Sequence, residues 1–262
     1  MDNRSNNSKI KVWAHRGCSY QHQENTLPAF LAACKLQGIT GIELDIQLTA
    51  DKEIIVFHDE KIDRLTVGTG RLCDYTLSEL KNLRFKNTEI HADGAEVSIP
   101  TMEEVLEQVK PYSEKYGVLI NIELKNSHMR YECMEEKILN LVSDYNMKRY
   151  VIYSSFNGDS LCKLKELDAG ISAGILKRTL EDCISFGKNN VIDAYHPSIE
   201  SMEVSGDLPD HAVIRVWNEE EPFYGQKKSI RLYDLTRVRE KGATDIITNV
   251  PEMYLKLTEL DT

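Results

Sequence analysis

The chain has 262 residues, of which 41% are hydrophobic and 28% charged, as is usual for a globular protein with a sizeable core. Its formal net charge is -10, and no segment gathers enough Lys and Arg to follow a phosphate backbone, which argues against a nucleic-acid partner. If such an acidic protein handles anionic phosphates, it must neutralise them locally, with a divalent cation or a few converging basic side chains.

Short β-like runs alternate with amphipathic helical patterns along the chain. Strands are predicted over residues 10–14, 41–48, 53–57, 118–124, 150–154, 171–176, 191–195, 212–217 and 245–248. Apolar residues at three- and four-residue spacing predict helices over residues 28–36, 102–109, 133–145, 159–167, 180–186 and 232–241. Repeated strand–helix units of this kind indicate a parallel sheet.

One connection breaks the alternation. Only residues 49–52 separate the second run from the third, and parallel neighbours need a crossover of about a dozen residues, so these two runs must form a hairpin. Without this antiparallel excursion eight parallel strands remain, the number that closes a barrel. We therefore predict a single α/β domain over residues 1–262, a (β/α)8 TIM barrel, with a hairpin that returns His58 close to the second strand.

Three carboxylates are expected inside this barrel. Glu43 and Asp45 stand two apart on the second strand and so share one face, and Glu123 lies on the next barrel strand. Buried carboxylates are costly unless they are paired or bind a cation. Salt bridges with barrel-lining Lys or Arg are one solution. The other, which we favour, is a divalent metal, because Mg2+ and Ca2+ prefer such hard oxygen ligands.

Two histidines stand beside these strands. His15 ends the first predicted strand, and His58 follows the returning strand of the hairpin. Active sites of such barrels lie at the carboxyl ends of the strands. Imidazole titrates near neutral pH, and phosphodiester cleavage needs one proton removed and another delivered to the leaving alkoxide. A lone histidine is more often structural, but this pair favours acid/base catalysis, with His15 as the base and His58 as the acid.

Basic and aromatic residues adjoin the same strand ends. Arg16 follows His15, and Lys125 follows Glu123 after one residue, so that each can reach a phosphoryl oxygen or pair with the acids. We predict phosphate contact for both. Trp217 ends a later strand and serves equally well as an apolar wall for the alcohol portion of a substrate or as a cap on the core. Residues 24–28 resemble a helix N-cap with proline in the first turn, and Asn25 among them is a weaker candidate for the site.

The cysteines form neither a Cys-x-x-Cys pair nor a zinc-like spacing, which argues against a disulfide framework and a structural zinc site. The first residues lack the apolar core of a secretory signal, and no run of about 18 apolar residues occurs. We therefore expect a cytoplasmic, soluble protein with free thiols and without stable membrane insertion.

The motifs around these residues resemble those of the glycerophosphodiester phosphodiesterase family. They follow the family's order from Val12 to Pro251: His15-Arg16-Gly17, Glu24-Asn25-Thr26, Glu43-Leu44-Asp45, His58-Asp59, Arg64-Leu65-Thr66, Asn121-Ile122-Glu123-Leu124-Lys125, Ser155-Phe156 and Val216-Trp217-Asn218. The resemblance implies a barrel with an insertion at about residues 49–99 and a divalent metal held by Glu43, Asp45 and Glu123. It also implies His15 and His58 as the acid/base pair, with Arg16 and Lys125 near the phosphate.

The chain departs from the family pattern in three places. Residues 18–23 replace the usual small-residue and proline sequence, Asn249 stands where an aspartate is common, and residues 218–230 are unusually acidic and then basic. These differences leave the implied chemistry intact and bear on the substrate.

We therefore predict metal-dependent hydrolysis of a small glycerophosphodiester to an alcohol and glycerol 3-phosphate, with Mg2+ or Ca2+ as the cofactor. The attacking group is water or a neighbouring glycerol hydroxyl. One alternative is a lysophospholipase D-like phosphodiesterase acting on lipids, for which no apolar rim is obvious. The other is a catalytically silent barrel that acts as a binding module, although no histidine or metal ligand is missing. The oligomeric state is left open.

Overall fold

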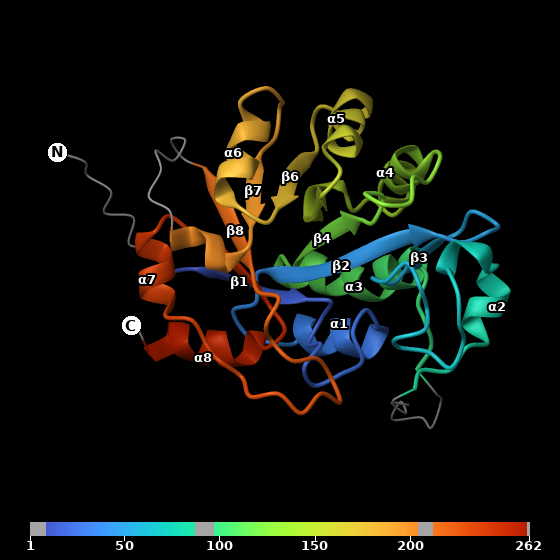
Figure 1. Cartoon of the computed structure of the whole chain (residues 1–262), viewed down its shortest axis with the longest axis horizontal. Coiled ribbons are helices and arrows are strands. Elements are labelled where there is room, and N and C mark those ends of the chain that lie inside the picture. Colours follow the sequence, from blue (N-terminus) through green and yellow to red (C-terminus); the bar gives the residue numbers. More distant parts are fainter. Residues whose placement is uncertain (1–8, 87–96, 204–211, 261–262) are drawn as a thin grey trace.

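Eight parallel strands close into a barrel in the computed structural model, which describes residues 9–86, 97–203 and 212–260. Their order is β1-β9-β8-β7-β6-β5-β4-β2, and the pairing of β1 with β2 closes the circle. Figure 1 shows these strands at the centre with the helices around them. The predicted TIM barrel is confirmed. Its strands are β1 (Lys11–His15), β2 (Gly41–Leu48), β4 (Leu119–Leu124), β5 (Val151–Ser155), β6 (Ser172–Lys177), β7 (Ala194–Pro197), β8 (Val213–Trp217) and β9 (Asp245–Thr248).

The ninth strand, β3 (Ile54–Val56), forms the predicted hairpin with the far end of β2. Ile46 pairs with Val56 in antiparallel register, and the last two residues of β2, Gln47 and Leu48, extend beyond its pairing with β4. The backbone N–H of Phe57 then donates to the carbonyl oxygen of Asp45 (3.0 Å). This bond brings the next residue, His58, back beside the acidic strand, as the short connection predicted.

Six of the helices were predicted, with shifted ends: α1 (Leu27–Cys34), α3 (Met102–Tyr116), α4 (Met134–Asp144), α5 (Gly158–Leu167), α6 (Leu180–Gly187) and α7 (Leu235–Glu240). Helix α3 runs seven residues past its predicted end, to the left-handed Gly117. Beyond Val109 its only buried residue is Ser113, so the apolar periodicity stops before the helix does. Helices α2 (Leu77–Lys81) and α8 (Pro251–Leu260) were not predicted. No helix within the described ranges is long and apolar enough to cross a membrane.

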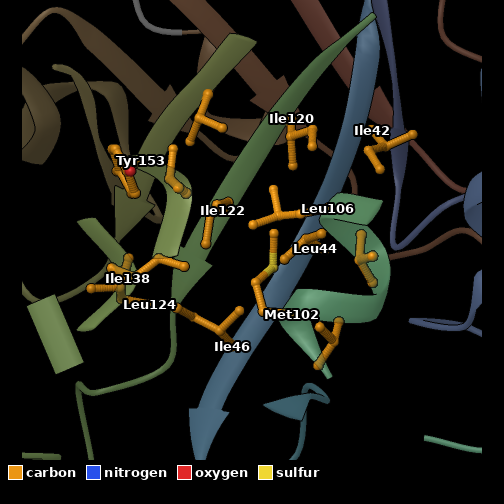
Figure 2. Close-up of a cluster of buried hydrophobic side chains, with 14 of the residues drawn as sticks. Ile42, Leu44, Ile46, Met102, Leu106, Ile120, Ile122, Leu124, Ile138 and Tyr153 are labelled. Carbon is orange, nitrogen blue, oxygen red and sulfur yellow. The ribbon is translucent and has the colours of Figure 1, made fainter. Parts of the chain in front are cut away.

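The alternation of side chains along β2 and β4 separates the core from the site. Ile42, Leu44 and Ile46 point outward and pack with β4 residues beneath α3 and α4, where Figure 2 shows them beside Met102 and Leu106. Successive side chains of a strand point to opposite faces. Glu43 and Asp45, which alternate with these three apolar residues, therefore point into the barrel.

The barrel interior holds a cluster of large side chains, Trp13, Ile152, Leu176, Trp217 and Ile247. Trp13 Nε1 donates to Asp245 Oδ1 (2.7 Å), and Arg215 Nε lies 3.3 Å from the same oxygen. Such filling is expected of an eight-stranded barrel, whose interior is a packed core and no pore. The acidic residues consequently lie at the bottom of an opening at the carboxyl ends of the strands.

The segment between β3 and α3 has a hydrophobic cluster of its own, formed by Ile55, Phe57, Ile62, Leu72, Leu80, Phe85, Val97 and Ile99. It carries α2 and lies beside the ends of β2 and β3 (Figure 1). Residues 87–96 of the predicted insertion lie outside the described residues. The description of the chain as one domain with an insertion at about residues 49–99 stays a prediction, which this packing supports.

Candidate active site

Three buried carboxylates meet in the barrel. Asp45 of β2 pairs in register with Glu123 of β4, and Glu43 lies one inward-facing position below Asp45. One oxygen of each lies within 4.8 Å of the others. Burial and the neighbouring charges of Asp45 and Glu123 raise the pKa of Glu43 well above its usual value. Glu43 Oε1 and Asp45 Oδ1 are buried without a hydrogen-bond partner, so this set of hard oxygen donors fits a divalent cation.

Basic side chains neutralise part of this charge. Lys125 Nζ lies 2.9 Å from Glu123 Oε1 and 3.9 Å from Asp45 Oδ1, and Arg16 Nε lies 3.3 Å from Asp45 Oδ2. Burial alone would raise the pKa of Asp45, but the charges of His58, Arg16 and Lys125 hold it below its usual value. The salt bridges considered from the sequence are thus present. Glu43 accepts only the backbone N–H of Arg16 through Oε2 (3.0 Å) and keeps its other oxygen free.

His15 is held in one orientation at the end of β1. Its Nδ1 lies 2.7 Å from Asn249 Oδ1, while Asn249 Nδ2 donates to the carbonyl oxygens of Glu221 (3.1 Å) and Pro222 (3.4 Å). These two acceptors assign the amide nitrogen, so Nδ1 of His15 must be the donor to Asn249 and Nε2 is left as an acceptor. Burial, and then the charge of Arg16, lower the pKa of His15 to about 3. The neutral ring therefore presents a lone pair on Nε2, which lies 3.8 Å from Glu43 Oε2.

His58 approaches the same cluster from the hairpin. Its Nδ1 lies 2.7 Å from Asp59 Oδ1, and its Nε2 lies 3.1 Å from Lys125 Nζ. The ring is thus fixed on one side by a carboxylate and faces the phosphate-binding candidate Lys125 on the other. The two histidines reach the carboxylates from different segments, which agrees with separate roles in proton removal and proton delivery.

The loop after β1 is bent sharply into the site. Arg16 and Asn25 both have positive φ, 56° and 55°, a conformation that is uncommon for residues other than glycine and is often found at functional sites. Asn25 Nδ2 donates to Asp45 Oδ2 (2.8 Å), and the backbone N–H of Asp45 donates to Asn25 Oδ1 (3.3 Å). Asn25, a weak candidate from the sequence, therefore orients one of the carboxylates.

A cavity of about 450 Å³ opens above these residues. Seven of the eight residues singled out from the sequence line it, and Asp45 lies buried beneath them. The seven are His15, Arg16, Glu43, His58, Glu123, Lys125 and Trp217. One wall is apolar, with Phe156 packed edge-on against Trp217 at a centroid distance of 6.0 Å beside Leu176 and Ile247. Trp217 Nε1 donates to the carbonyl oxygen of His196 (2.9 Å), which directs the indole along this wall.

Several lining residues were not singled out for the site from the sequence. Phe223 lies over the guanidinium of Arg16 (4.9 Å to the ring centroid) and 6.0 Å from the ring of His15. It belongs to the segment 218–230, which was marked only by its charges. Asn121 and Ser154 line the cavity, and their Oδ1 and Oγ atoms are buried without a hydrogen-bond partner. Their inward orientation follows from the alternation along β4 and β5, and Asn121 also begins the family motif that contains Glu123.

The family model of the glycerophosphoryl diester phosphodiesterase family matches residues 15–253. A glycerophosphodiester phosphodiesterase of Bacillus altitudinis is 34% identical over 256 residues, covering 95% of this chain and 98% of its own. One from Caldanaerobacter subterraneus subsp. tengcongensis is 34% identical over 258 residues, with coverages of 95% and 98%.

A solved structure supports the fold assignment. The phosphodiesterase of Oleispira antarctica, in complex with the product sn-glycerol-3-phosphate, is 22% identical, has a TM-score of 0.69, and is matched over 97% of this chain and 98% of its own. At this identity the likeness concerns the fold. The family model and the relatives carry the assignment further: the chain belongs to the glycerophosphoryl diester phosphodiesterase family, a family of phosphoric diester hydrolases.

Proposed function

We propose that this protein hydrolyses small glycerophosphodiesters to an alcohol and glycerol 3-phosphate in a reaction that depends on Mg2+ or Ca2+. The observation that carries the proposal is the meeting of three buried carboxylates with two histidines around one cavity. Glu43, Asp45 and Glu123 would hold the cation, and their unpartnered oxygens support this assignment. Bound there, a divalent cation would supply Lewis-acid polarisation of a phosphoryl oxygen and offset its charge.

The two histidines divide the proton transfers in this proposal. His15, neutral and with a free Nε2, takes the proton of the attacking water or of the neighbouring glycerol hydroxyl. His58 gives a proton to the oxygen of the leaving alcohol. Arg16 and Lys125 bind phosphate oxygens and balance the charge that develops as phosphorus is attacked.

A short polyol suits the remainder of the cavity. The apolar wall of Phe156, Leu176 and Trp217 can pack against a carbon chain, and the unpartnered Asn121 Oδ1 and Ser154 Oγ can bind hydroxyl groups. A polar floor of this kind favours a deacylated glycerol over an acylated one. This observation supports glycerophosphodiesters over the lysophospholipase D-like alternative.

The test is hydrolysis of glycerophosphocholine, glycerophosphoethanolamine, lysophosphatidylcholine and bis(p-nitrophenyl) phosphate by the purified protein. Each assay is run with EDTA and then with Mg2+ or Ca2+ restored. We expect metal-dependent release of glycerol 3-phosphate from the first two. Preference for lysophosphatidylcholine would transfer the assignment to lipid substrates, and inactivity with every substrate and metal would point to a silent binding module.

We also propose a cytoplasmic location and a small-molecule substrate as the principal partner. The described structure supports the location through its thiols, because all six cysteines are free and three of them are buried. Fractionation of the native cells, followed by detection of the protein in the soluble cytoplasmic fraction, tests this point.

A further inference from the structure

One guanidinium joins the two loops that carry the histidines. Arg64 Nε and Nη2 donate to the two carboxylate oxygens of Asp59, at 2.6 and 3.0 Å. Its Nη1 and Nη2 also donate to the carboxylate of Glu24, at 2.7 and 2.8 Å. Asp59 holds His58 Nδ1, and Glu24 accepts a further bond from Arg16 Nη1 (2.6 Å). A continuous chain of charged hydrogen bonds thus runs from His58 to Arg16.

We propose that Arg64 is a positioning residue that fixes the orientation of His58 through Asp59, with Glu24 as its buried anchor. The inference rests on the proposed function, in which His58 protonates the leaving alcohol. Asp59 engages Nδ1 of His58, so that Nε2 is the ring nitrogen that faces Lys125. Without Arg64, Asp59 would lose the two hydrogen bonds from the guanidinium that fix its carboxylate, and the imidazole bonded to that carboxylate would lose its fixed direction.

The burial of the anchor separates this arrangement from an ordinary surface ion pair. The Glu24 side chain is 1% exposed, and a carboxylate so deeply buried requires full compensation by its partners. Arg16 and Arg64 provide that compensation with three hydrogen bonds to its carboxylate. The ring of Phe223 lies over both guanidiniums, 4.9 Å from Arg16 and 5.9 Å from Arg64, and restricts their movement further.

The planar fork of arginine is needed for this role. Arg64 makes four hydrogen bonds to the carboxylates of Glu24 and Asp59, which stand 35 residues apart in the sequence. A lysine ammonium is a compact charge on a flexible stem and cannot reproduce this geometry. Arg64→Lys therefore keeps the charge and removes the orientation.

The proposal predicts that the loss of kcat in Arg64→Lys depends on the leaving group of the substrate. An alkoxide needs a proton from a well-placed acid, whereas p-nitrophenolate leaves readily without one. Arg64→Lys should therefore lower kcat about 10–100-fold for glycerophosphoethanolamine, within the range for loss of an orienting partner. The loss for bis(p-nitrophenyl) phosphate should be about threefold or less, and KM for either substrate should change little.

The experiment measures kcat and KM for both substrates with the metal-loaded wild type, Arg64→Lys, Asp59→Asn, His58→Ala and the double variant of Arg64→Lys with His58→Ala. Arg71→Lys is the matched control, because Arg71 makes the same two-bond contact with Asp74 in the same segment and, among the residues that the structure describes, does not line the cavity. We expect Asp59→Asn to share the leaving-group-selective loss, and the control to retain wild-type kinetics. In the His58→Ala background, Arg64→Lys should cause little further loss, because its effect is transmitted through that histidine.

The outcomes are distinct. Equal losses on both substrates, additive losses in the double variant, or wild-type kinetics of Arg64→Lys would each overturn the positioning role while leaving the proposed function in place. Should Arg64→Lys fail to fold, the leaving-group dependence of Asp59→Asn decides the question in the same way. Inactivity of the wild type on both substrates would overturn the proposed function, and this inference with it.

Discussion

Nδ1 of His15 faces Oδ1 of Asn249 at 2.7 Å, and this contact determines which nitrogen of the imidazole is directed to the carboxylates. The two residues lie 234 positions apart, His15 at the end of the first strand and Asn249 directly after the last strand of the barrel. An amide in this place holds the tautomer without adding a charge to the ring. Asn249, which stands where an aspartate is common in the family, therefore contacts one of the two proposed catalytic residues.

Asn249→Ala tests this contact. Loss of the acceptor should release the ring of His15 and lower kcat about 10–100-fold, with a small change in KM. Asn82→Ala serves as the control, because within the described ranges the Asn82 side chain bonds the carbonyl of Ser78 at an exposed helix end and does not line the cavity. Steady-state kinetics with glycerophosphoethanolamine measure the effect, and an unchanged kcat for Asn249→Ala would contradict the orienting role.

The histidines themselves give the largest expected losses. His15→Ala and His58→Ala should each lower kcat about 10²–10⁴-fold, the range for a general acid or base, and leave the thermal midpoint and metal affinity nearly unchanged. His128→Ala, an exposed histidine outside the cavity, should behave as wild type. Near-normal turnover of either active-site variant would remove that residue from the mechanism.

Glu43→Gln should raise the thermal stability of the metal-free protein and reduce the stabilisation that a bound metal provides. Without metal it removes a carboxylate that is buried beside two others, so the melting temperature should rise. Wild-type protein should gain about 2.7 kcal/mol at a metal concentration 100 times the dissociation constant, and the variant should lose most of this gain. Thermal unfolding with and without Mg2+ or Ca2+ measures both the melting temperature of the metal-free protein and the stabilisation that the metal adds.

Glu135→Gln is the matched control for this comparison. Glu135 is also buried, but it pairs with Lys163 and Asn126 outside the cavity. Its variant should lower the melting temperature and keep the metal-induced rise. An equal metal-induced rise in Glu43→Gln and wild type would exclude Glu43 as a ligand.

Hydroxyl binding at the floor of the cavity is tested by substituting Ser154, with Ser113 as the control. Ser154→Ala should lower kcat/KM for glycerophosphoethanolamine about 3–10-fold more than for bis(p-nitrophenyl) phosphate, which has no glycerol hydroxyl. Ser113 Oγ is likewise buried without a partner, but it lies on α3 away from the cavity, so Ser113→Ala should show no such difference. Equal losses on both substrates in Ser154→Ala would argue against hydroxyl binding at this place.

Most of the fold followed from local patterns, and the differences have local causes. The strand predicted over residues 191–195 lies at Ala194–Pro197, because Val191 is 77% exposed and belongs to the connection from α6. Helix α8 was missed although Pro251 stands at its first position, a common helix start. Neither difference moves a residue that was singled out for the site.

The sequence by itself determined the strand count, the hairpin, and the inward face that carries Glu43, Asp45 and Glu123. These features depend on the two-residue period of a strand and on the length of a connection, both of which are local properties. Only the tertiary structure decided that Asn249 orients His15, that Glu24 lies between Arg16 and Arg64, and that Phe223 covers both guanidiniums. Such contacts join loops far apart in the chain, and their geometry is set by closure of the barrel, which brings the carboxyl ends of its strands to one rim.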